Sequence, residues 1–116
     1  VEDGVDGIVV SNHGGRQFDG GRSSIEILPE VADAVGDRLE VYFDSGVRSG
    51  LDVLRAMALG ARAVFVGRPV HWGLAYGGEA GVSLALEILR AEFDKVLAFS
   101  GSRSVAEVGR EHVLVG

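Results

Sequence analysis

Three short apolar segments, each followed at once by a polar loop that contains glycine, constrain the fold of this chain more than any other feature. They are residues 7–10, 41–43 and 63–66. All three are continuously apolar and rich in β-branched or aromatic residues, which is typical of parallel strands covered on both faces. Glycine supplies 18 of the 116 residues and clusters in the loops behind these segments. Because parallel strands are joined through helical crossovers, the sequence predicts an α/β fold.

Helical patterns occupy the gaps between these segments. The first, at 23–36, begins with a capping-box pattern and contains Pro29, which predicts one broken helix or two short ones. The second, at 51–59, follows Ser49 as a good N-cap and ends before a glycine. A short helix is predicted at 69–76, ended by Gly77 and Gly78, and a long amphipathic helix follows at 79–100. A short tail helix and an apolar terminal segment complete a β-α-β-α-β-α order.

This order fills neither of the common parallel α/β frames. A doubly wound sheet normally has about five strands, and a (β/α)8 barrel needs eight strands and about 250 residues. A sheet of only three parallel strands would leave both of its edges unpaired. The chain also begins at Val1, without methionine, and runs almost at once into a strand-like segment. We therefore expect it to be a piece of a longer protein.

Composition excludes several classes of function. The chain is 47% hydrophobic and 24% charged, as expected of a globular protein, and it has no cysteine for disulfides, thiol chemistry or cysteine-bound metal. Its net charge of −6 argues against general nucleic-acid binding, although local anion sites stay open. No apolar run reaches the ~20 residues of a membrane span and no export signal is visible, so a cytoplasmic protein is expected. Motifs for nucleotide triphosphates, classical dinucleotides, metallohydrolases and serine hydrolases are absent, and no metal site is expected.

The second and third loops together predict an anion site. Ligands of parallel α/β folds bind beyond the carboxyl ends of the strands. Asp44, Gly46 and Arg48 follow the second segment, and Gly67 and Arg68 follow the third. Helix N-termini supply N–H donors, glycine lets an anion approach the backbone, and arginine adds charge-assisted hydrogen bonds, so a phosphate would fit. The alternative is that the glycines only make tight turns and the arginines are solvated.

The first loop predicts a pair of residues that could bind and deprotonate an acid. His13 is the only titratable base at a strand end, and Arg16 lies three residues away across two glycines. A guanidinium can hold a carboxylate while a neighbouring imidazole takes a proton from the same substrate. A lone histidine in a loop is more often a structural hydrogen-bonder, and we interpret His71 and His112 in that way. Trp72, on the following helix, is interpreted as a packing residue.

The segment 11–17, Ser-Asn-His-Gly-Gly-Arg-Gln, resembles the signature of the FMN-dependent 2-hydroxy acid oxidases and dehydrogenases. That family also carries D-G-G-[VI]-R and A-x-x-[VI]-G-R-P motifs, which resemble residues 44–48 and 63–69 of this chain. With further likeness at 72–75 and 79–82, the resemblance covers essentially the whole chain. Ser45, where the family motif has glycine, is most similar to lactate 2-monooxygenase and the related lactate oxidases.

The resemblance implies that residues 1–116 are the C-terminal part of a single FMN-binding barrel domain. They would carry strands six to eight of a (β/α)8 TIM barrel that is incomplete in this chain. His13 would be the active-site base that takes a proton from an L-2-hydroxy acid, lactate- or glycolate-like, while two electrons pass to FMN and the 2-oxo acid forms. Arg16, together with His13, would bind the substrate through its carboxylate. The residues that would bind FMN are Asp44, Ser45, Gly46, Arg48, Gly67 and Arg68.

The first five strands of the family match nothing in these residues, so we expect activity from the full-length parent and not from the isolated chain. The missing N-terminal part of the barrel is then the expected partner, and family likeness suggests a homotetramer. The sequence leaves open which 2-hydroxy acid is oxidised, whether oxygen, a quinone or a cytochrome accepts the electrons, and whether hydride or a carbanion is involved. The alternatives are a non-catalytic phosphate-binding or assembly module and a different phosphate- or FMN-binding barrel.

Overall fold

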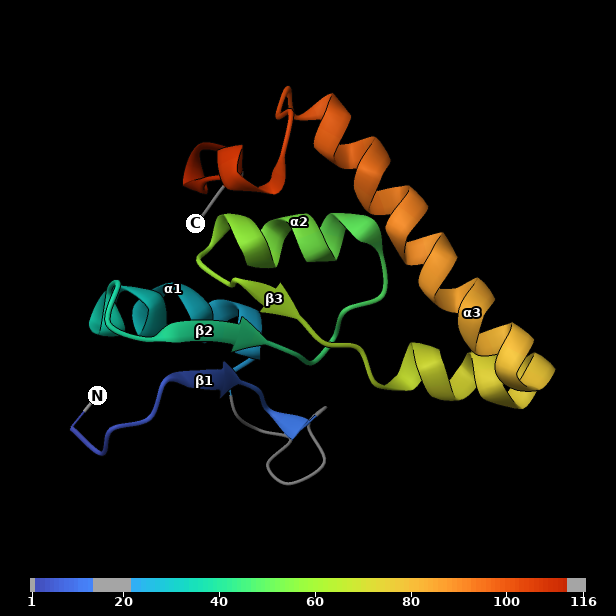
Figure 1. Ribbon diagram of the computed structural model, residues 1–116, viewed down its shortest axis with the longest axis horizontal. Coiled ribbons are helices and arrows are strands. Elements are labelled where there is room, and N and C mark those ends of the chain that lie inside the picture. Colours follow the sequence, from blue (N-terminus) through green and yellow to red (C-terminus); the bar gives the residue numbers. More distant parts are fainter. Residues whose placement is uncertain (1, 14–21, 113–116) are drawn as a thin grey trace.

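The computed structural model describes residues 2–13 and 22–112 (Figure 1). Its strands and helices alternate along the chain, and two short 3-10 helices close it. In chain order they are β1 (Gly7–Val10), α1 (Ser24–Val35), β2 (Glu40–Phe43), α2 (Gly50–Ala58), β3 (Ala63–Val64), α3 (Arg68–Phe99), η2 (Val105–Glu107) and η3 (Arg110–His112). The predicted α/β class and β-α-β-α-β-α order are confirmed.

The three strands form one parallel sheet in the order β1-β2-β3. Val10 of β1 lies opposite Phe43 of β2, which in turn lies opposite Val64 of β3. β3 ends at Val64 and is therefore two residues shorter than the predicted segment 63–66. The Phe65 N–H still donates to the Phe43 carbonyl at 2.9 Å. All three carboxyl ends therefore point to the same edge of the sheet, where the polar loops begin.

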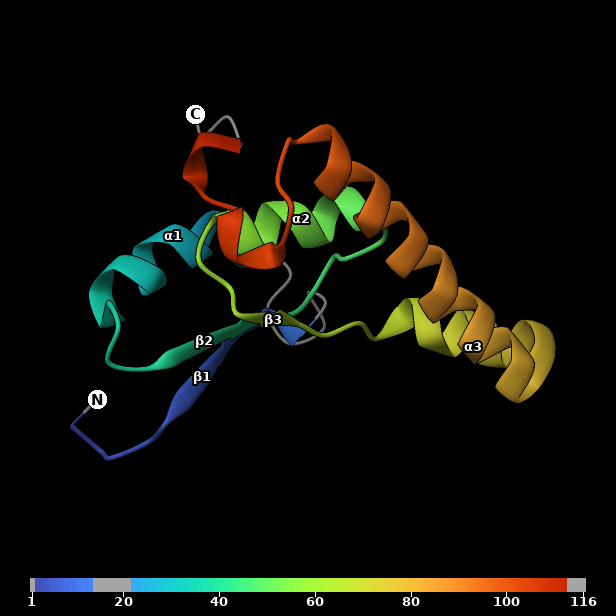
Figure 2. The same cartoon turned by 45° about the horizontal axis from the view of Figure 1, so that its top comes forward.

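Helices α1 and α2 lie on the same side of the sheet (Figure 2). Strand residues that face these helices form the core together with Leu28 of α1 and Ala56 of α2, both fully buried. On the opposite face Val9 is 49% exposed and Phe65 is 48% exposed. The prediction of strands covered on both faces is therefore wrong for the described residues, because this chain supplies helices to one face only.

Helix α1 is a single helix, so the prediction of a broken helix at Pro29 is wrong. A proline inside a helix removes one backbone hydrogen bond and costs about 3 kcal/mol. Leu28, next to it, is completely buried against the sheet, and Ser24 Oγ donates to the Asp44 carbonyl at 2.9 Å. These tertiary contacts hold the helix in place across its local weak point.

Helix α2 follows the predicted pattern. Ser49 is its N-cap, and the Asp52 N–H donates to Ser49 Oγ at 3.2 Å. Gly60, just beyond the helix, has φ +121°, and a Cβ there would lie 2.7 Å from the Ala32 Cβ of α1. Glycine thus allows both the left-handed turn and the close passage of the two helices.

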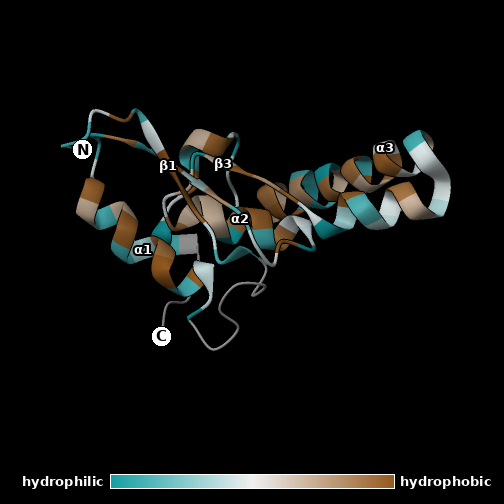
Figure 3. Cartoon of the chain, turned by 90° about the horizontal axis from the view of Figure 1, so that it is seen from below, coloured by the Kyte–Doolittle hydropathy of each residue, from teal (hydrophilic) through white to brown (hydrophobic). Residues whose placement is uncertain are grey.

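Helix α3 consists of two arms joined at a kink at Gly77 and Gly78, the two glycines that the sequence marked. The arms meet at Gly73 and Gly81, where a Cβ on Gly81 would lie 1.9 Å from the Gly73 carbonyl oxygen. Figure 3 shows α3 extending away from the sheet, with apolar residues along both arms. Among the described residues, no helix combines the length and the apolar character needed to cross a bilayer.

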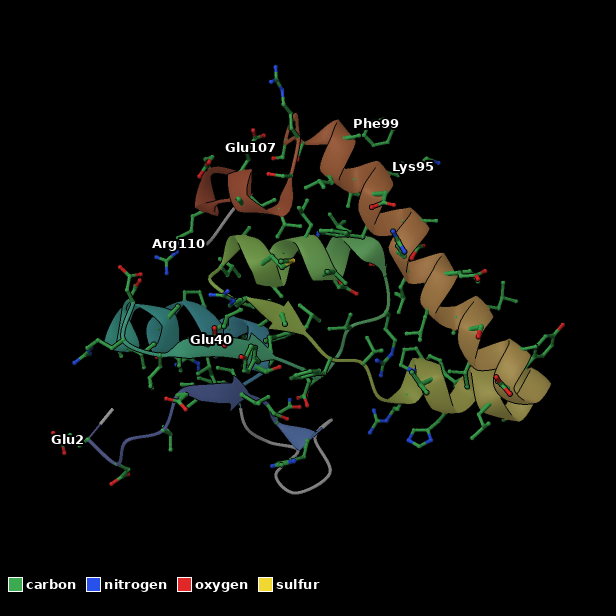
Figure 4. All side chains as sticks on the ribbon, viewed as in Figure 1. Glu2, Glu40, Lys95, Phe99, Glu107 and Arg110 are labelled. Carbon is green, nitrogen blue, oxygen red and sulfur yellow. The ribbon has the colours of Figure 1, made fainter. Side chains whose placement is uncertain are left out.

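The tail after α3 returns to the first helix. Arg110 of η3, labelled in Figure 4, pairs with Asp33 of α1 through Nη2 and Oδ1 at 2.7 Å. The tail helix predicted from the capping pattern at Ser104 is present as the 3-10 helices η2 and η3. The predicted apolar terminal segment lies outside the described residues.

Candidate functional site

A hollow of about 240 Å³ lies at the carboxyl edge of the sheet, and we refer to it as the loop cleft. Every candidate residue lines it except Arg16, which lies outside the described residues. The residues that line the cleft are Ser11, His13, Asp44, Ser45, Gly46, Val47, Arg48, Phe65, Val66, Gly67, Arg68 and His71. The prediction that the three loops converge at one edge is confirmed by this arrangement.

A second hollow of about 340 Å³ adjoins the loop cleft on the side of α1. Arg48 and Arg68 line both hollows, and Arg55 of α2 lines the second one. Three guanidinium groups therefore lie at this end of the molecule, although the chain as a whole has a net charge of −6. Asp44 and Asp52 line these hollows as well, and Asp52 pairs with Arg55 at 3.7 Å. A small anion would therefore meet chiefly Arg48 and Arg68.

Arg48 is held in place by an aromatic side chain. Its guanidinium carbon lies 5.0 Å from the ring centroid of Trp72, and its Nη1 donates to the Val47 carbonyl at 2.9 Å. A cation over an indole face is a favourable contact. Sequence interpretation placed Trp72 in packing and missed this role, because the contact joins two residues of different loops and helices.

The backbone donors at the start of α2 are already engaged inside the chain. The Arg48 N–H donates to Asp52 Oδ2 at 2.9 Å, and the Gly50 N–H donates to Glu92 Oε1 at 3.2 Å. The Asp52 N–H is held by the N-cap serine. Side-chain oxygens thus occupy three of the backbone donors around the start of α2, so this helix offers fewer N–H groups to an anion than the sequence predicts.

The start of α3 and the loop after β2 do leave room for an anion. Gly67 is the N-cap residue of α3, and a Cβ added there or at Gly46 would meet nothing within 4 Å. Gly46 also has φ +77°, which favours glycine. Open backbone on two loops, the N-terminus of α3 and the guanidinium groups of Arg48 and Arg68 together fit a phosphate group.

The His13 side of the cleft has an unusual backbone. His13 has φ +55°, and Ser45 opposite it has φ +87°, both in the left-handed region that non-glycine residues rarely adopt. The His13 side chain is exposed at the cleft, where an imidazole can accept a proton. Within the described residues, the Asn12 side-chain oxygen is buried without a hydrogen-bond partner. An acceptor in that position suits a donor from a ligand or from another part of the protein.

The sequence predicts structural roles for the other two histidines, His71 and His112. His71 also lines the loop cleft, in the first turns of α3. The side chain of His112 lies outside the description. No group of three or more His, Asp or Glu side chains suited to a metal occurs in residues 2–13 and 22–112.

Below the cleft, Tyr42 on the uncovered face of the sheet is linked to charged neighbours. Its hydroxyl donates to the Glu40 carboxylate, which also pairs with Arg62 at 3.3 Å. The hydrogen bond to Glu40 raises the pKa of Tyr42, burial and the carboxylate charge add to the rise, and Arg62 opposes it. The Tyr42 ring packs on Phe65, which lines the loop cleft, with 5.9 Å between ring centroids.

Comparison with known proteins gives one consistent family. Residues 1–115 match the family described as FMN-dependent dehydrogenase. The 2-hydroxyacid oxidase 1 of Mus musculus is 56% identical over 110 residues, which are 95% of this chain and 30% of that protein. An L-lactate dehydrogenase of Azorhizobium caulinodans is 52% identical over 111 residues, or 96% of this chain and 29% of that protein.

A solved structure of mandelate oxidase with benzoyl-formic acid superposes with a TM-score of 0.90 at 51% sequence identity. The match covers 94% of this chain and 32% of that one. The chain therefore spans about a third of the length of the proteins that it matches.

Proposed function

Because the chain belongs to the FMN-dependent dehydrogenase family, whose cofactor is FMN, we propose that it is the C-terminal third of an enzyme that oxidises an L-2-hydroxy acid to the 2-oxo acid. The observation that carries the proposal is the loop cleft, where the candidate base and the candidate phosphate ligands of three separate loops lie together. The relatives named above support hydroxy acid oxidation as the type of reaction. We assign the activity to the complete protein, because this chain supplies only half of the active site.

We assign the three strands to positions six to eight of a (β/α)8 barrel. Two features of the sheet support this assignment: it is wholly parallel, and its helices cover one face only. Additional strands beside β1 and β3 would pair the open edges, and closure would bury the exposed Val9 and Phe65 inside the barrel. The missing N-terminal part of the barrel is thus the partner that the fold requires.

The cofactor phosphate is assigned to the side of the loop cleft formed by α3 and the loop after β2. Gly67 and Arg68 would bind it at the start of α3, and Arg48, held by Trp72, would bind it from the opposite loop. Gly46 leaves the backbone of that loop accessible to the phosphate. Asp44 and Ser45 line the same cleft between Gly46 and His13. When bound, FMN supplies the two-electron acceptor that no side chain of the chain provides.

His13 is assigned as the base, and Arg16 as the ligand of the substrate carboxylate. Oxidation of a 2-hydroxy acid releases two electrons and two protons, and the exposed imidazole at the cleft is placed to take one of those protons. The guanidinium groups of Arg48 and Arg68 would attract the anionic substrate and cofactor to this end of the molecule. The electron acceptor is left unassigned, since the relatives carry both oxidase and dehydrogenase names. A homotetramer and a cytoplasmic location stay predictions.

A chimeric enzyme tests the proposal. In it, residues 1–116 replace the matching third of the mouse 2-hydroxyacid oxidase 1, to which they are 56% identical over 110 residues. We expect this protein to bind FMN and to oxidise 2-hydroxy acids. His13→Ala should abolish turnover and retain FMN, while Arg48→Ala with Arg68→Ala should lose FMN. Binding of phosphate compounds without any turnover would favour the non-catalytic module instead.

A further inference from the structure

We propose that Ser45 is a positioning residue whose hydroxyl ties the His13 loop, residues 11–13, to the end of β2 and so sets where the imidazole lies. The inference rests on the proposed function in taking His13 as the base. It goes beyond that function because it gives Ser45 a role separate from cofactor binding. Four hydrogen bonds and two unusual backbone angles carry the inference.

The hydroxyl of Ser45 is the centre of the hydrogen bonds. It donates to Asp44 Oδ1 at 2.9 Å and accepts from the Asn12 N–H at 3.3 Å. It also lies 3.3 Å from Ser11 Oγ, and because its own proton is on Asp44, Ser11 is the donor in that pair. The hydroxyl thus acts once as a donor and twice as an acceptor in these contacts.

The same hydrogen bonds continue to the histidine. Ser11 Oγ accepts the N–H of His13 at 3.0 Å. The chain of contacts thus runs from Asp44 through Ser45 and Ser11 to the backbone of His13, across more than thirty residues of sequence. A shift of the Ser45 hydroxyl would move the residue that carries the base.

The other end of this chain of contacts is fixed. The Asp44 N–H donates to the Val10 carbonyl of β1 at 3.1 Å, and the Asp44 carbonyl accepts from Ser24 Oγ of α1 at 2.9 Å. Asp44 is therefore anchored to the sheet and to a helix, whereas the His13 side chain is exposed. This chain of hydrogen bonds, which we call the Ser45 tether, connects the anchored Asp44 to the His13 loop.

The backbone of Ser45 shows that its side chain is retained against a conformational cost. At φ +87° a glycine would fit without strain, and an L side chain would not. His13, at φ +55°, is in the same left-handed region. Strained residues persist where the surrounding contacts hold them, often at functional sites. Here the Ser45 hydroxyl is bound to Asp44, Asn12 and Ser11, and Ser11 Oγ in turn accepts the N–H of His13.

Two substitutions separate positioning from a merely structural role. Ser45→Gly removes both the hydroxyl and the strain, and Ser45→Ala removes the hydroxyl and keeps the strain. In the chimeric enzyme we expect Ser45→Ala to lower kcat by about ten-fold to a hundred-fold, the range typical of a misplaced catalytic group. Ser45→Gly, which relieves the strain and gives the residue of the family motif, should lower kcat less. We expect KM for the hydroxy acid to change less than kcat, since Arg16, the proposed ligand of the carboxylate, is not altered. A loss of FMN affinity as large as the loss of kcat would mean that Ser45 acts through the cofactor and would overturn the inference. Ser45→Gly should be at least as heat-stable as the parent protein.

Amide hydrogen exchange gives a readout that does not depend on turnover. The Asn12 amide, which donates to Ser45 Oγ, should exchange about ten-fold faster in both Ser45 variants, because one protecting hydrogen bond of about 1 kcal/mol is worth roughly that factor. The His13 amide keeps its own bond to Ser11 Oγ and should be accelerated less. The Asp52 amide, which bonds to Ser49 Oγ, is the internal control and should not change. Ser49→Ala is the matched variant, and it should speed exchange at Asp52 only and leave kcat unchanged.

The inference is wrong if Ser45→Ala keeps the parent kcat, or if activity in the two variants simply follows their thermal stability. It is also wrong if the Asn12 amide keeps its protection. If the unsubstituted chimera binds FMN but turns over no hydroxy acid, the proposed function fails. The exchange experiment still decides whether Ser45 holds the loop, so the two failures are distinguishable.

Discussion

The contact between Arg48 and Trp72 predicts a measurable coupling in FMN binding. Arg48→Ala would remove the proposed charge-assisted hydrogen bond to phosphate, worth about 1.5–3 kcal/mol, and should raise the Kd for FMN roughly ten-fold to a hundred-fold. Trp72→Ala removes only the support of that guanidinium. The guanidinium carbon lies 5.0 Å from the ring centroid, and both side chains are exposed, so the contact is worth about 0.5–1 kcal/mol and the Kd should rise about two- to five-fold.

A double-mutant cycle, measured by FMN fluorescence titration of the chimeric enzyme, isolates this effect. In the Arg48→Ala background, Trp72→Ala should cost nothing further, because the cation that the indole supports is gone. Tyr76→Ala, four residues on along the same arm and 88% exposed, is the matched control and should leave the Kd unchanged. An equal loss from Trp72→Ala in both backgrounds would refute the reasoning, since Trp72 would then act without Arg48.

Two further predictions concern the scaffold. Gly50→Ala should destabilise the chain by about 1–3 kcal/mol in urea unfolding, because the new Cβ would lie 2.1 Å from the Phe93 backbone nitrogen. Gly77→Ala, whose Cβ meets nothing within 4 Å, is the control, and equal stability of the two variants would contradict the packing argument. The hydrogen bond to Glu40 raises the pKa of Tyr42 above 10.0, so its stabilising effect is complete below pH 10.0 and is lost as pH rises through the raised value. Tyr42→Phe should remove this alkaline loss of stability, and an unchanged pH profile of unfolding would exclude Tyr42 as its cause.

The parts of the fold that could be predicted from sequence are those set by local chemistry. Continuous apolar segments located β1 and β2, and the Ser49 cap located the start of α2. The convergence of the polar loops followed from strand direction alone, because parallel strands share one carboxyl edge. Pro29 misled the prediction of α1, since burial of Leu28 outweighs the local preference of proline.

The parts of the site that were missed depend on residues far apart in sequence. Glu92 occupies the Gly50 N–H at the start of α2 from 42 residues away, and no local pattern shows that pairing. The support of Arg48 by Trp72 and the tether from Ser45 to the His13 loop are long-range contacts of the same kind. Sequence spacing pointed to the described candidate residues that line the cleft, but it could not give the hydrogen bonds that connect them.

The central claim is that the loops after β2 and β3 hold the phosphate of FMN, and a comparison of FMN with riboflavin tests it most directly. Riboflavin carries the same ring system and lacks the phosphate. In the chimeric enzyme we predict that FMN binds tighter than riboflavin by about ten-fold or more, the value of charge-assisted hydrogen bonds, and that the Arg48→Ala/Arg68→Ala variant loses this advantage. Equal affinity for the two flavins, or an FMN preference that survives in the double variant, would contradict the account.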